Sequence, residues 1–241
     1  QTLTLSGSAT ANSANVTGVS SLSTTGLTLG NGSNGGLAAN YQLPASTSTV
    51  SIHPLSLSAS ITGAPTKQYD ATDSATLTSG NYSLSGFIAG EGATVTQTVG
   101  SYNTANATSN AAYSPATTVS AALVPAHFTA DVGTTLSNYV LPTTATGSGV
   151  ITTAPLTLSA NSYSAFAGQA PASFTGSVTG AQGSDSITVS ITQAASGIAG
   201  IYTLTPAAVM STSLVGNYGT PTVVTGTYTE AQQYQLVVSA A

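Results

Sequence analysis

Apolar residues alternate with hydroxyl residues along this chain, and this period of two constrains its fold more than any other feature. The alternation is clearest in the runs 3–5, 27–29, 55–57, 156–158 and 187–191. Because successive side chains of a strand point to opposite faces, each run can bury its apolar residues and expose Ser or Thr. Gly, Asn and Pro interrupt the runs about every 8–12 residues, as in sandwiches and barrels. The sequence therefore predicts an all-β protein of antiparallel β-sandwich modules.

Formal charge is nearly absent from the chain. Lys67 is its one lysine or arginine, it carries six acidic residues, and it has no cysteine and no tryptophan among 241 residues. Nucleic-acid binding needs basic residues that displace counterions from phosphates. Zinc fingers, iron–sulfur clusters and disulfide frameworks need cysteine. We therefore expect no nucleic-acid partner and no cofactor.

The hydropathy pattern indicates a folded, soluble chain. Apolar residues make up 41% of the sequence, far more than a disordered polar chain would hold. None of the apolar runs reaches the roughly 18 residues that a membrane-spanning helix needs. A basic segment followed by an apolar one, the pattern of a signal peptide, is not visible at the start. We expect no membrane insertion.

Internal repeats divide the chain into modules. The motif Asn40-Tyr41-Gln42-Leu43-Pro44 returns 98 residues later as Asn138-Tyr139-Val140-Leu141-Pro142, and Asn217-Tyr218 is a weaker third copy. The strand-like run that begins at Pro54 returns 101 residues later at Pro155. These repeats predict a partial module over 1–53 (the C-terminal half of a repeat), a full module over 54–154 and a last module over 155–241, arranged as a rod.

The two ends of this array suggest a way of assembling. About 50 residues without disulfides are a poor basis for an independent core, so 1–53 must gain strands from preceding chain, the neighbouring module or another copy. An extra alternating run near the C-terminus places Tyr234, Leu236 and Val238 on one face. Such a run can add to an exposed sheet edge of another copy. The alternative is an ordinary edge strand beside a short terminal domain.

Two sets of motifs carry a family resemblance. Lys67-Gln68-Tyr69-Asp70, Gly90-Glu91-Gly92 and Asn138-Tyr139 resemble the YDG repeat domain of large bacterial surface proteins of the filamentous-haemagglutinin type. Gly183-Ser184-Asp185 and Asn217-Tyr218 look like the related MBG domain. The sequence departs from the YDG pattern at Ala71, where the family usually has glycine.

The resemblance implies a rod-like array of β-domains on an exported bacterial protein. Such arrays act as stalks of adhesins and as fibres of the cell surface or the biofilm matrix. The implied location is extracellular, the implied partners are other copies or adjacent repeats, and the implied function includes no enzymatic activity.

The residues themselves give structural roles to these markers. Asp70 can accept backbone N–H groups two residues later and so fix an Asx-turn. Tyr69 can pack its ring on the edge of the sandwich and point its hydroxyl outward, whereas Tyr139 anchors the core. Asn138 tolerates the backbone of a turn that precedes a strand.

Metal and covalent sites have few candidate residues. Asp70, Asp73 and Glu91 are the carboxylates that could gather near one end of the middle module, with Lys67 among them. A calcium ion could bind there; the alternative is an ion pair of Lys67 with Asp70 or Asp73. An intramolecular isopeptide bond would also have to use Lys67, with Glu91 as the nearby acid. We expect the chain to hold no metal.

Neither catalysis nor recognition has a strong motif. The sequence has no Gly-x-Ser-x-Gly elbow, and its two histidines, His53 and His127, do not form part of a catalytic pattern. Tyr102 and Tyr113 lie in a long irregular stretch and are the best-placed exposed aromatic residues. The sequence therefore predicts a structural stalk or fibre segment, and the alternative is an extracellular polysaccharide-binding module that uses these two tyrosines.

Overall fold

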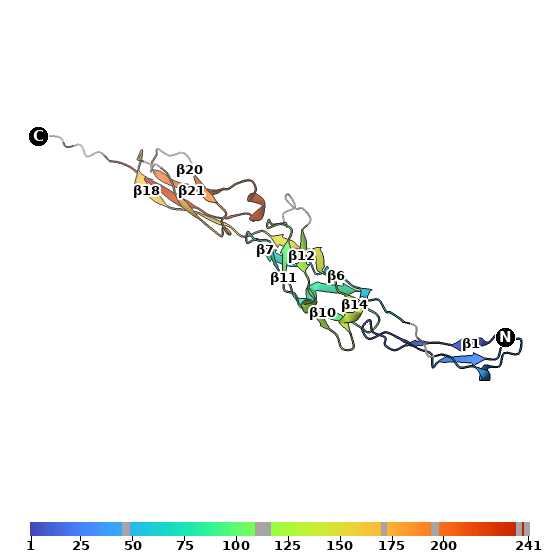
Figure 1. The fold of residues 1–241 in the computed structure, drawn as a ribbon. Coiled ribbons are helices and arrows are strands. Elements are labelled where there is room, and N and C mark those ends of the chain that lie inside the picture. The colour runs from blue at the N-terminus through green and yellow to red at the C-terminus, as the bar shows by residue number, and fades with distance from the viewer. Residues whose placement is uncertain (45–48, 109–116, 170–172, 194–197, 235–237, 239–241) are drawn as a thin grey trace. The chain divides into compact units, whose positions relative to one another are not determined.

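The computed structural model describes residues 1–44, 49–108, 117–169, 173–193, 198–234 and 238, and these residues form β-strands and short 3₁₀ helices (Figure 1). The all-β prediction is confirmed. Among these residues there is no helix with the length and apolar character required to span a membrane.

The chain divides into two compact units. Unit 1 consists of Gln1–Ser60, Thr78–Gln97 and Ala122–Ala145, and unit 2 of Ile61–Leu77, Thr98–Ala121 and Thr146–Ala241. Strands β6 (Ser58–Ile61), β12 (Thr118–Ala122) and β15 (Thr144–Ser148) each have residues in both units. The module boundaries expected near 54 and 155 stay predictions.

Unit 1 is built from short strand pairs and four 3₁₀ turns. Its strands are β1 (Thr4–Gly7), β2 (Thr10–Ala11), β3 (Leu22–Ser23), β4 (Leu27–Gly30), β5 (Leu55–Ser56), β9 (Tyr82–Ser85), β10 (Ala93–Val95), β13 (Phe128–Ala130) and β14 (Tyr139–Val140). Its 3₁₀ helices are η1 (Ala38–Asn40), η2 (Ser79–Asn81), η3 (Pro125–His127) and η4 (Leu136–Asn138). Strand β1 pairs with β4, β2 with β3 and β10 with β13, all antiparallel, and β5 pairs with β14 in parallel.

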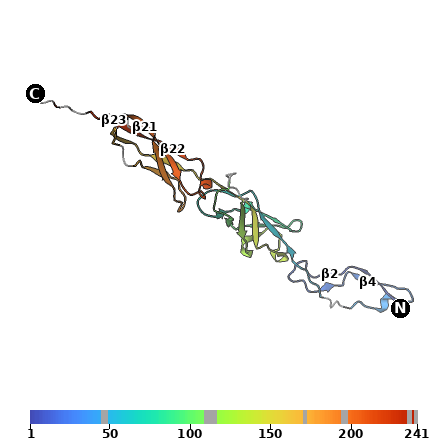
Figure 2. The same ribbon diagram turned by 90° about the horizontal axis from the view of Figure 1, so that it is seen from above.

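Unit 2 contains the longer sheets. Its strands are β7 (Thr66–Gln68), β8 (Ser74–Thr76), β11 (Val99–Tyr102), β16 (Val150–Thr152), β17 (Thr157–Ala160), β18 (Tyr163–Phe166), β19 (Gly176–Thr179), β20 (Thr188–Gln193), β21 (Gly200–Val209), β22 (Thr222–Val224) and β23 (Gly226–Ala231), and its 3₁₀ helix is η5 (Val215–Asn217). Strands β8, β11 and β12 are neighbours in that order, β17 lies between β19 and β22, and a four-stranded sheet has the order β18-β23-β21-β20. Strands β21, β22 and β23 are labelled in Figure 2.

The expected antiparallel pairing holds for only some of the strand pairs. Parallel pairs among the described residues include β5 with β14, β7 with β16, β17 with β22 and β18 with β23. Leu55 pairs with Tyr139 and Thr66 with Val150, 84 residues apart in both cases, whereas Thr157 pairs with Thr222 and Tyr163 with Tyr228, 65 residues apart. In residues 55–152 and again in residues 157–231, strands near the start therefore lie beside strands near the end, and the long connection between them is what a parallel pair requires.

The buried apolar side chains follow the alternation of the sequence. In unit 1 they are Leu57, Val95, Leu123, Phe128, Tyr139 and Ala145. In unit 2 the largest, each at most 2% exposed, are Leu77, Val119, Ile151, Leu156, Leu158, Leu204 and Tyr228. Residues 1–44, all of which the structure describes, contribute no apolar side chain to this set. Their strands are held by ladders and by hydroxyl pairs such as Ser6 with Thr28, 2.9 Å apart.

Candidate functional site

The carboxylate of Asp185 joins two tyrosines that are far apart in sequence. Its Oδ2 accepts hydrogen bonds from the hydroxyls of Tyr69, at 2.9 Å, and Tyr218, at 2.6 Å. The two rings meet edge to face with centroids 5.6 Å apart. Tyr69 follows β7, Asp185 lies between β19 and β20, and Tyr218 follows η5. Markers from the predicted middle module and the predicted last module therefore meet at one carboxylate.

A glycine turn positions Asp185. Gly180 has a φ of +97°, and a Cβ on it would lie 2.4 Å from the carbonyl oxygen of Pro155, so only glycine fits. Two residues later, Gln182 donates its N–H to the Tyr218 hydroxyl at 2.8 Å. The turn closes when the Asp185 N–H donates to the carbonyl of Gln182 at 3.0 Å.

Burial and the carboxylate keep both hydroxyls protonated. Burial is the main cause that raises the pKa of Tyr69 from 10.0 to about 12, and its hydrogen bond to Asp185 adds to the rise. The same two causes raise the pKa of Tyr218 to about 12. A protonated hydroxyl donates to the carboxylate, whereas a phenolate beside it would repel it, so the group is stable up to strongly alkaline pH.

An asparagine beside Tyr218 binds a loop of the preceding region. Asn217 is 1% exposed, and its Oδ1 accepts the N–H of Ala107 at 2.9 Å. Its Nδ2 donates to Oδ1 of Asn106 at 3.0 Å. The loop is fixed in turn because the Asn106 N–H donates to Oγ1 of Thr104 at 3.1 Å. We call this arrangement an asparagine clasp. In it, one asparagine (here Asn217) binds the side chain of a loop asparagine (Asn106) and the backbone N–H of the residue after that loop asparagine (Ala107).

The same clasp occurs a second time, within unit 1. Oδ1 of Asn138 accepts the N–H of Val16 at 2.9 Å, and its Nδ2 donates to Oδ1 of Asn15 at 2.9 Å. The Asn15 N–H donates to Oγ of Ser13 at 3.0 Å. Asn138 is thus bound by the loop Ser13-Ala14-Asn15 through the same hydrogen bonds that join Asn217 to the loop Thr104-Ala105-Asn106.

The tyrosine after each closing asparagine binds an acid in both regions. The Tyr139 hydroxyl donates to Oε2 of Glu91 at 2.7 Å and accepts the Ile88 N–H at 3.4 Å. Burial, followed by the hydrogen bond to Glu91, raises the pKa of Tyr139. Glu91 lies five residues after Gly86, whose φ is +105°, as Asp185 lies five residues after Gly180. We call the two acid–tyrosine pairs, Glu91 with Tyr139 and Asp185 with Tyr218, closing latches.

The Tyr69-Asp70 motif forms the turn that the sequence predicted. Asp70 accepts the Thr72 N–H at 2.9 Å, and Lys67 Nζ lies 2.6 Å from Asp70 Oδ1. Burial opposes ionisation of Asp70, but the hydrogen bonds from Lys67 and Thr72 outweigh it and lower its pKa. Ala71 has a φ of +62°. The turn therefore has a left-handed backbone at an alanine, at a cost of about 1–2 kcal/mol.

The ion pair proposed as the alternative to calcium is present. Lys67 Nζ also donates to the carbonyl and hydroxyl oxygens of Thr72 and lies 5.6 Å from the centroid of the Tyr102 ring. Asp73 accepts the Tyr102 N–H through its backbone carbonyl, and Glu91 belongs to a closing latch. In the part of the chain that the structure describes, no three His, Cys, Asp or Glu residues form a group able to hold a metal ion.

The expectation that Tyr102 is exposed is wrong. Tyr102 is 4% exposed, and its hydroxyl donates to the carbonyl of Pro65 at 2.9 Å. It ends β11, where Val99 and Ser101 face outward and Gly100 and Tyr102 face inward. The alternation of side chains along a strand could have indicated this burial, because it places Tyr102 on the same face of β11 as Gly100, which is the inward face. Tyr113 lies outside the described residues.

The predicted assembly residues are exposed where the structure describes them. Tyr234 is 86% exposed and Val238 is 80% exposed. Leu236 lies outside the described residues. Their role in strand addition stays a prediction.

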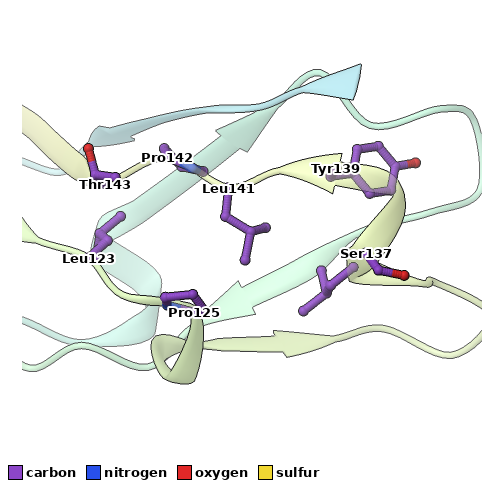
Figure 3. Close-up of a pocket in the computed structure, with 8 residues that line it drawn as sticks. Leu123, Pro125, Ser137, Tyr139, Leu141, Pro142 and Thr143 are labelled. Carbon is purple, nitrogen blue, oxygen red and sulfur yellow. The ribbon is translucent and has the colours of Figure 1, made fainter. Parts of the chain in front are cut away.

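A hollow of about 450 Å³ lies beside the closing turn of unit 1 (Figure 3). Its lining residues are Leu123, Pro125, Leu136, Ser137, Tyr139, Leu141, Pro142 and Thr143. Leu141 points into the hollow, while the hydroxyl of Tyr139 points away from it (Figure 3). Because that hydroxyl is bound to Glu91 and the other lining groups are mostly apolar, the hollow offers few polar partners to a sugar.

Comparison with known proteins supports the resemblance for one segment. Residues 53–147 match the family model of the YDG domain. No match was found among curated proteins or among solved structures. The likeness of residues 155–241 to the MBG domain stays a prediction.

Proposed function

We propose that this chain is a segment of an extracellular stalk or fibre of a bacterial surface or biofilm matrix, built from tandem YDG-type β-modules. In this proposal the chain is not an enzyme and needs no cofactor, and its partners are adjacent repeats or other copies. Assembly between copies proceeds by addition of the C-terminal run. The YDG match over residues 53–147 supports the family context.

The observation that carries the proposal is the repetition of the asparagine clasp. A stalk needs each repeat to hold the next in a defined way, and a specific clasp with two hydrogen bonds can do this. The clasps of Asn138 and Asn217 use the same atoms on loops of the same sequence type. A binding module or an enzyme has no need to repeat such a contact.

The uncharged surface fits the same function. The chain carries seven formal charges, so outward positions of its strands hold mostly Ser and Thr. Hydroxyl pairs bridge neighbouring strands, as between Ser159 and Ser177 at 2.7 Å. Few charges are present for salt to screen, and the edges lack the lysines that often prevent strand addition.

Immunogold labelling of intact cells of the source organism tests the proposal. Antibodies raised against the purified chain should label extended material outside the cell, and the label should persist in high salt. Cells from which the coding region is deleted are the matched control. Label confined to the cytoplasm would contradict the proposal.

A further inference from the structure

The turn that follows β4 contains both Asn-Gly pairs of the chain, Asn31-Gly32 and Asn34-Gly35. An asparagine before glycine can lose its side-chain amide without an enzyme, because glycine has no Cβ to hinder the attack of its nitrogen on the side-chain carbonyl carbon. The reaction requires that the asparagine side chain and the glycine N–H are free at the same time. The two pairs differ in this respect, although they lie three residues apart.

Asn31-Gly32 is held by hydrogen bonds at both reacting groups. Oδ1 of Asn31 accepts the Ala38 N–H at 2.7 Å, and the Gly32 N–H donates to the Gly36 carbonyl at 3.0 Å. Oγ1 of Thr4, on β1, donates to the backbone carbonyl of Asn31 at 3.5 Å. The Gly32 nitrogen can therefore reach Cγ of Asn31 only after hydrogen bonds of the turn have opened.

Asn34-Gly35 has neither restraint. Both residues are exposed, and in residues 1–44, all of which the structure describes, neither the Asn34 side chain nor the Gly35 N–H takes part in a hydrogen bond. Asn34 has a φ of +65° and Gly35 a φ of +79°, and a Cβ on Gly35 would meet nothing within 4 Å. The pair thus lies in open space, where water reaches it and the side chain can rotate.

We propose that Asn34 is a site of spontaneous deamidation in the folded chain and that Asn31 is protected from it. The Gly35 nitrogen forms a bond to Cγ of Asn34, its proton passes to the side-chain amide, and that amide leaves as ammonia. The product is a cyclic succinimide, which one water molecule opens at either carbonyl to leave aspartate or isoaspartate at position 34. One water is taken up and one ammonia is released, so the step needs no oxidant, reductant or cofactor.

The product places a charge where the chain has none. Residues 1–66 contain no Asp, Glu, Lys or Arg, so the carboxylate at position 34 becomes the one charged side chain of that stretch. An exposed aspartate has a pKa of about 4, so the new group is ionised at neutral pH and lowers the net charge from −5 by one unit. Isoaspartate also inserts a methylene into the main chain. This modification does not depend on the proposed function.

Incubation of the full chain in mildly alkaline buffer tests the inference, with Asn31 as the internal control. Tandem mass spectrometry of chymotryptic peptides should show deamidation at Asn34 at least about tenfold faster than at Asn31, since about 1.4 kcal/mol of hydrogen bonding at the protected pair has that effect. In concentrated urea the two pairs should react at similar rates. Asn34→Gln should remove the early change, and Gly35→Ala should slow it because the added Cβ hinders the nitrogen.

A pair of variants at Ala38 tests the protection of Asn31. Ala38→Pro removes the N–H that binds Oδ1 of Asn31. Proline suits this position because Ala38 is the first residue of η1, and Leu37 before it is extended, with φ −99° and ψ 118°. Ala38→Ser keeps the N–H. Deamidation at Asn31 should be severalfold faster in the proline variant and unchanged in the serine variant, while circular dichroism reports that both are folded.

Three results would overturn the inference. The first is equal deamidation of Asn31 and Asn34 in the native chain. The second is an intact Asn34 under conditions in which a synthetic peptide of residues 29–37 deamidates. The third is an Asn31 that reacts no faster in the folded Ala38→Pro variant, which would refute protection by this hydrogen bond.

Discussion

Residues 1–44 and the described part of residues 93–142 have similar local hydrogen bonds but differ in how many apolar side chains they bury. Asn12 and Ser21 exchange two bonds, from Asn12 N–H to the Ser21 carbonyl and from Ser21 N–H to Asn12 Oδ1. Asn103 and Thr118 exchange the same two. The end pair of the β1–β4 ladder is Thr4 with Gly30, whereas the end pair of the β10–β13 ladder consists of two large apolar residues, Val95 and Phe128.

The difference lies in burial. Val95 is 1% exposed and Phe128 is 7% exposed, whereas Leu5 on β1 is 58% exposed. Turn and ladder bonds are local, so a half-repeat can form them alone. A core needs the strands that the opening half of a repeat supplies, as Leu57 does in unit 1. Stability should therefore be distributed unequally between two regions of the same backbone design.

The largest effect should come from the core. Leu77→Ala removes a side chain that is 1% exposed and should lower the free energy of unfolding by about 2–5 kcal/mol. Leu5→Ala, in the region without a core, should change it by less than about 0.5 kcal/mol. Urea denaturation followed by tyrosine fluorescence measures both. Equal costs would contradict the difference in burial between Leu5 and Leu77.

Glycine substitutions sharpen the comparison at the turns. A Cβ on Gly86 would meet the Ser56 carbonyl oxygen at 2.7 Å at a φ of +105°, so Gly86→Ala should cost about 2–4 kcal/mol. Gly35 also has positive φ, +79°, but a Cβ there meets nothing within 4 Å. Gly35→Ala should cost about 1 kcal/mol. Thermal denaturation by circular dichroism distinguishes the two; a larger loss at Gly35 would contradict this account.

The asparagines predict a smaller contrast. Asn217→Ala leaves the Ala107 N–H without its acceptor in a buried place and should cost about 1–3 kcal/mol. Asn40 is the exposed counterpart, and Asn40→Ala should stay within about 0.5 kcal/mol. Hydrogen exchange at Ala107 should accelerate in the first variant alone. Unchanged exchange there would show that the clasp does not hold the loop.

The two tyrosines bound to Asp185, Tyr69 and Tyr218, should produce an alkaline transition. Because the pKa values of Tyr69 and Tyr218 are raised from 10.0 to about 12, their contribution is complete below pH 10 and is lost as pH rises to about 12. The double variant Tyr69→Phe, Tyr218→Phe should lose about 1–3 kcal/mol at neutral pH and show a flatter decline above pH 10. Unfolding free energies at pH 8 to 12 measure it, and an unchanged alkaline slope would refute the assignment.

The all-β class followed from the sequence because alternation is local. Parallel pairing did not, since it joins residues 65 or 84 apart and no short pattern reports it. The repeat offset shows the limit well. The prolines Pro54 and Pro155 suggest a repeat offset of 101 residues. The strand pairing gives an offset of 99, because Leu55 pairs with Tyr139 and Ala154 pairs with the corresponding Tyr218. A shift of two keeps every side chain on its face, so the alternation is the same for both.

The site was predictable only in part. The Asx-turn at Asp70 depends on neighbours in sequence and was expected correctly. The hydrogen bond between Tyr69 and Asp185 joins residues 116 apart in sequence, so it could not be predicted without the three-dimensional structure. The asparagine clasps could have been suspected, because Ser13-Ala14-Asn15 and Thr104-Ala105-Asn106 are alike and the closing Asn-Tyr motif is repeated, but which motif binds which loop is tertiary information.

The parallel closure of residues 155–231 has a consequence for a chain under tension. Strand β17 begins this region and β22 lies near its end, and the two are hydrogen-bonded side by side in the same direction. A pull on the two ends slides these strands along each other, so their ladder bonds bear the load together and break together. The hairpin of β20 and β21 would instead open one bond at a time, but it is connected inside the region and bears little load until the outer pair has failed.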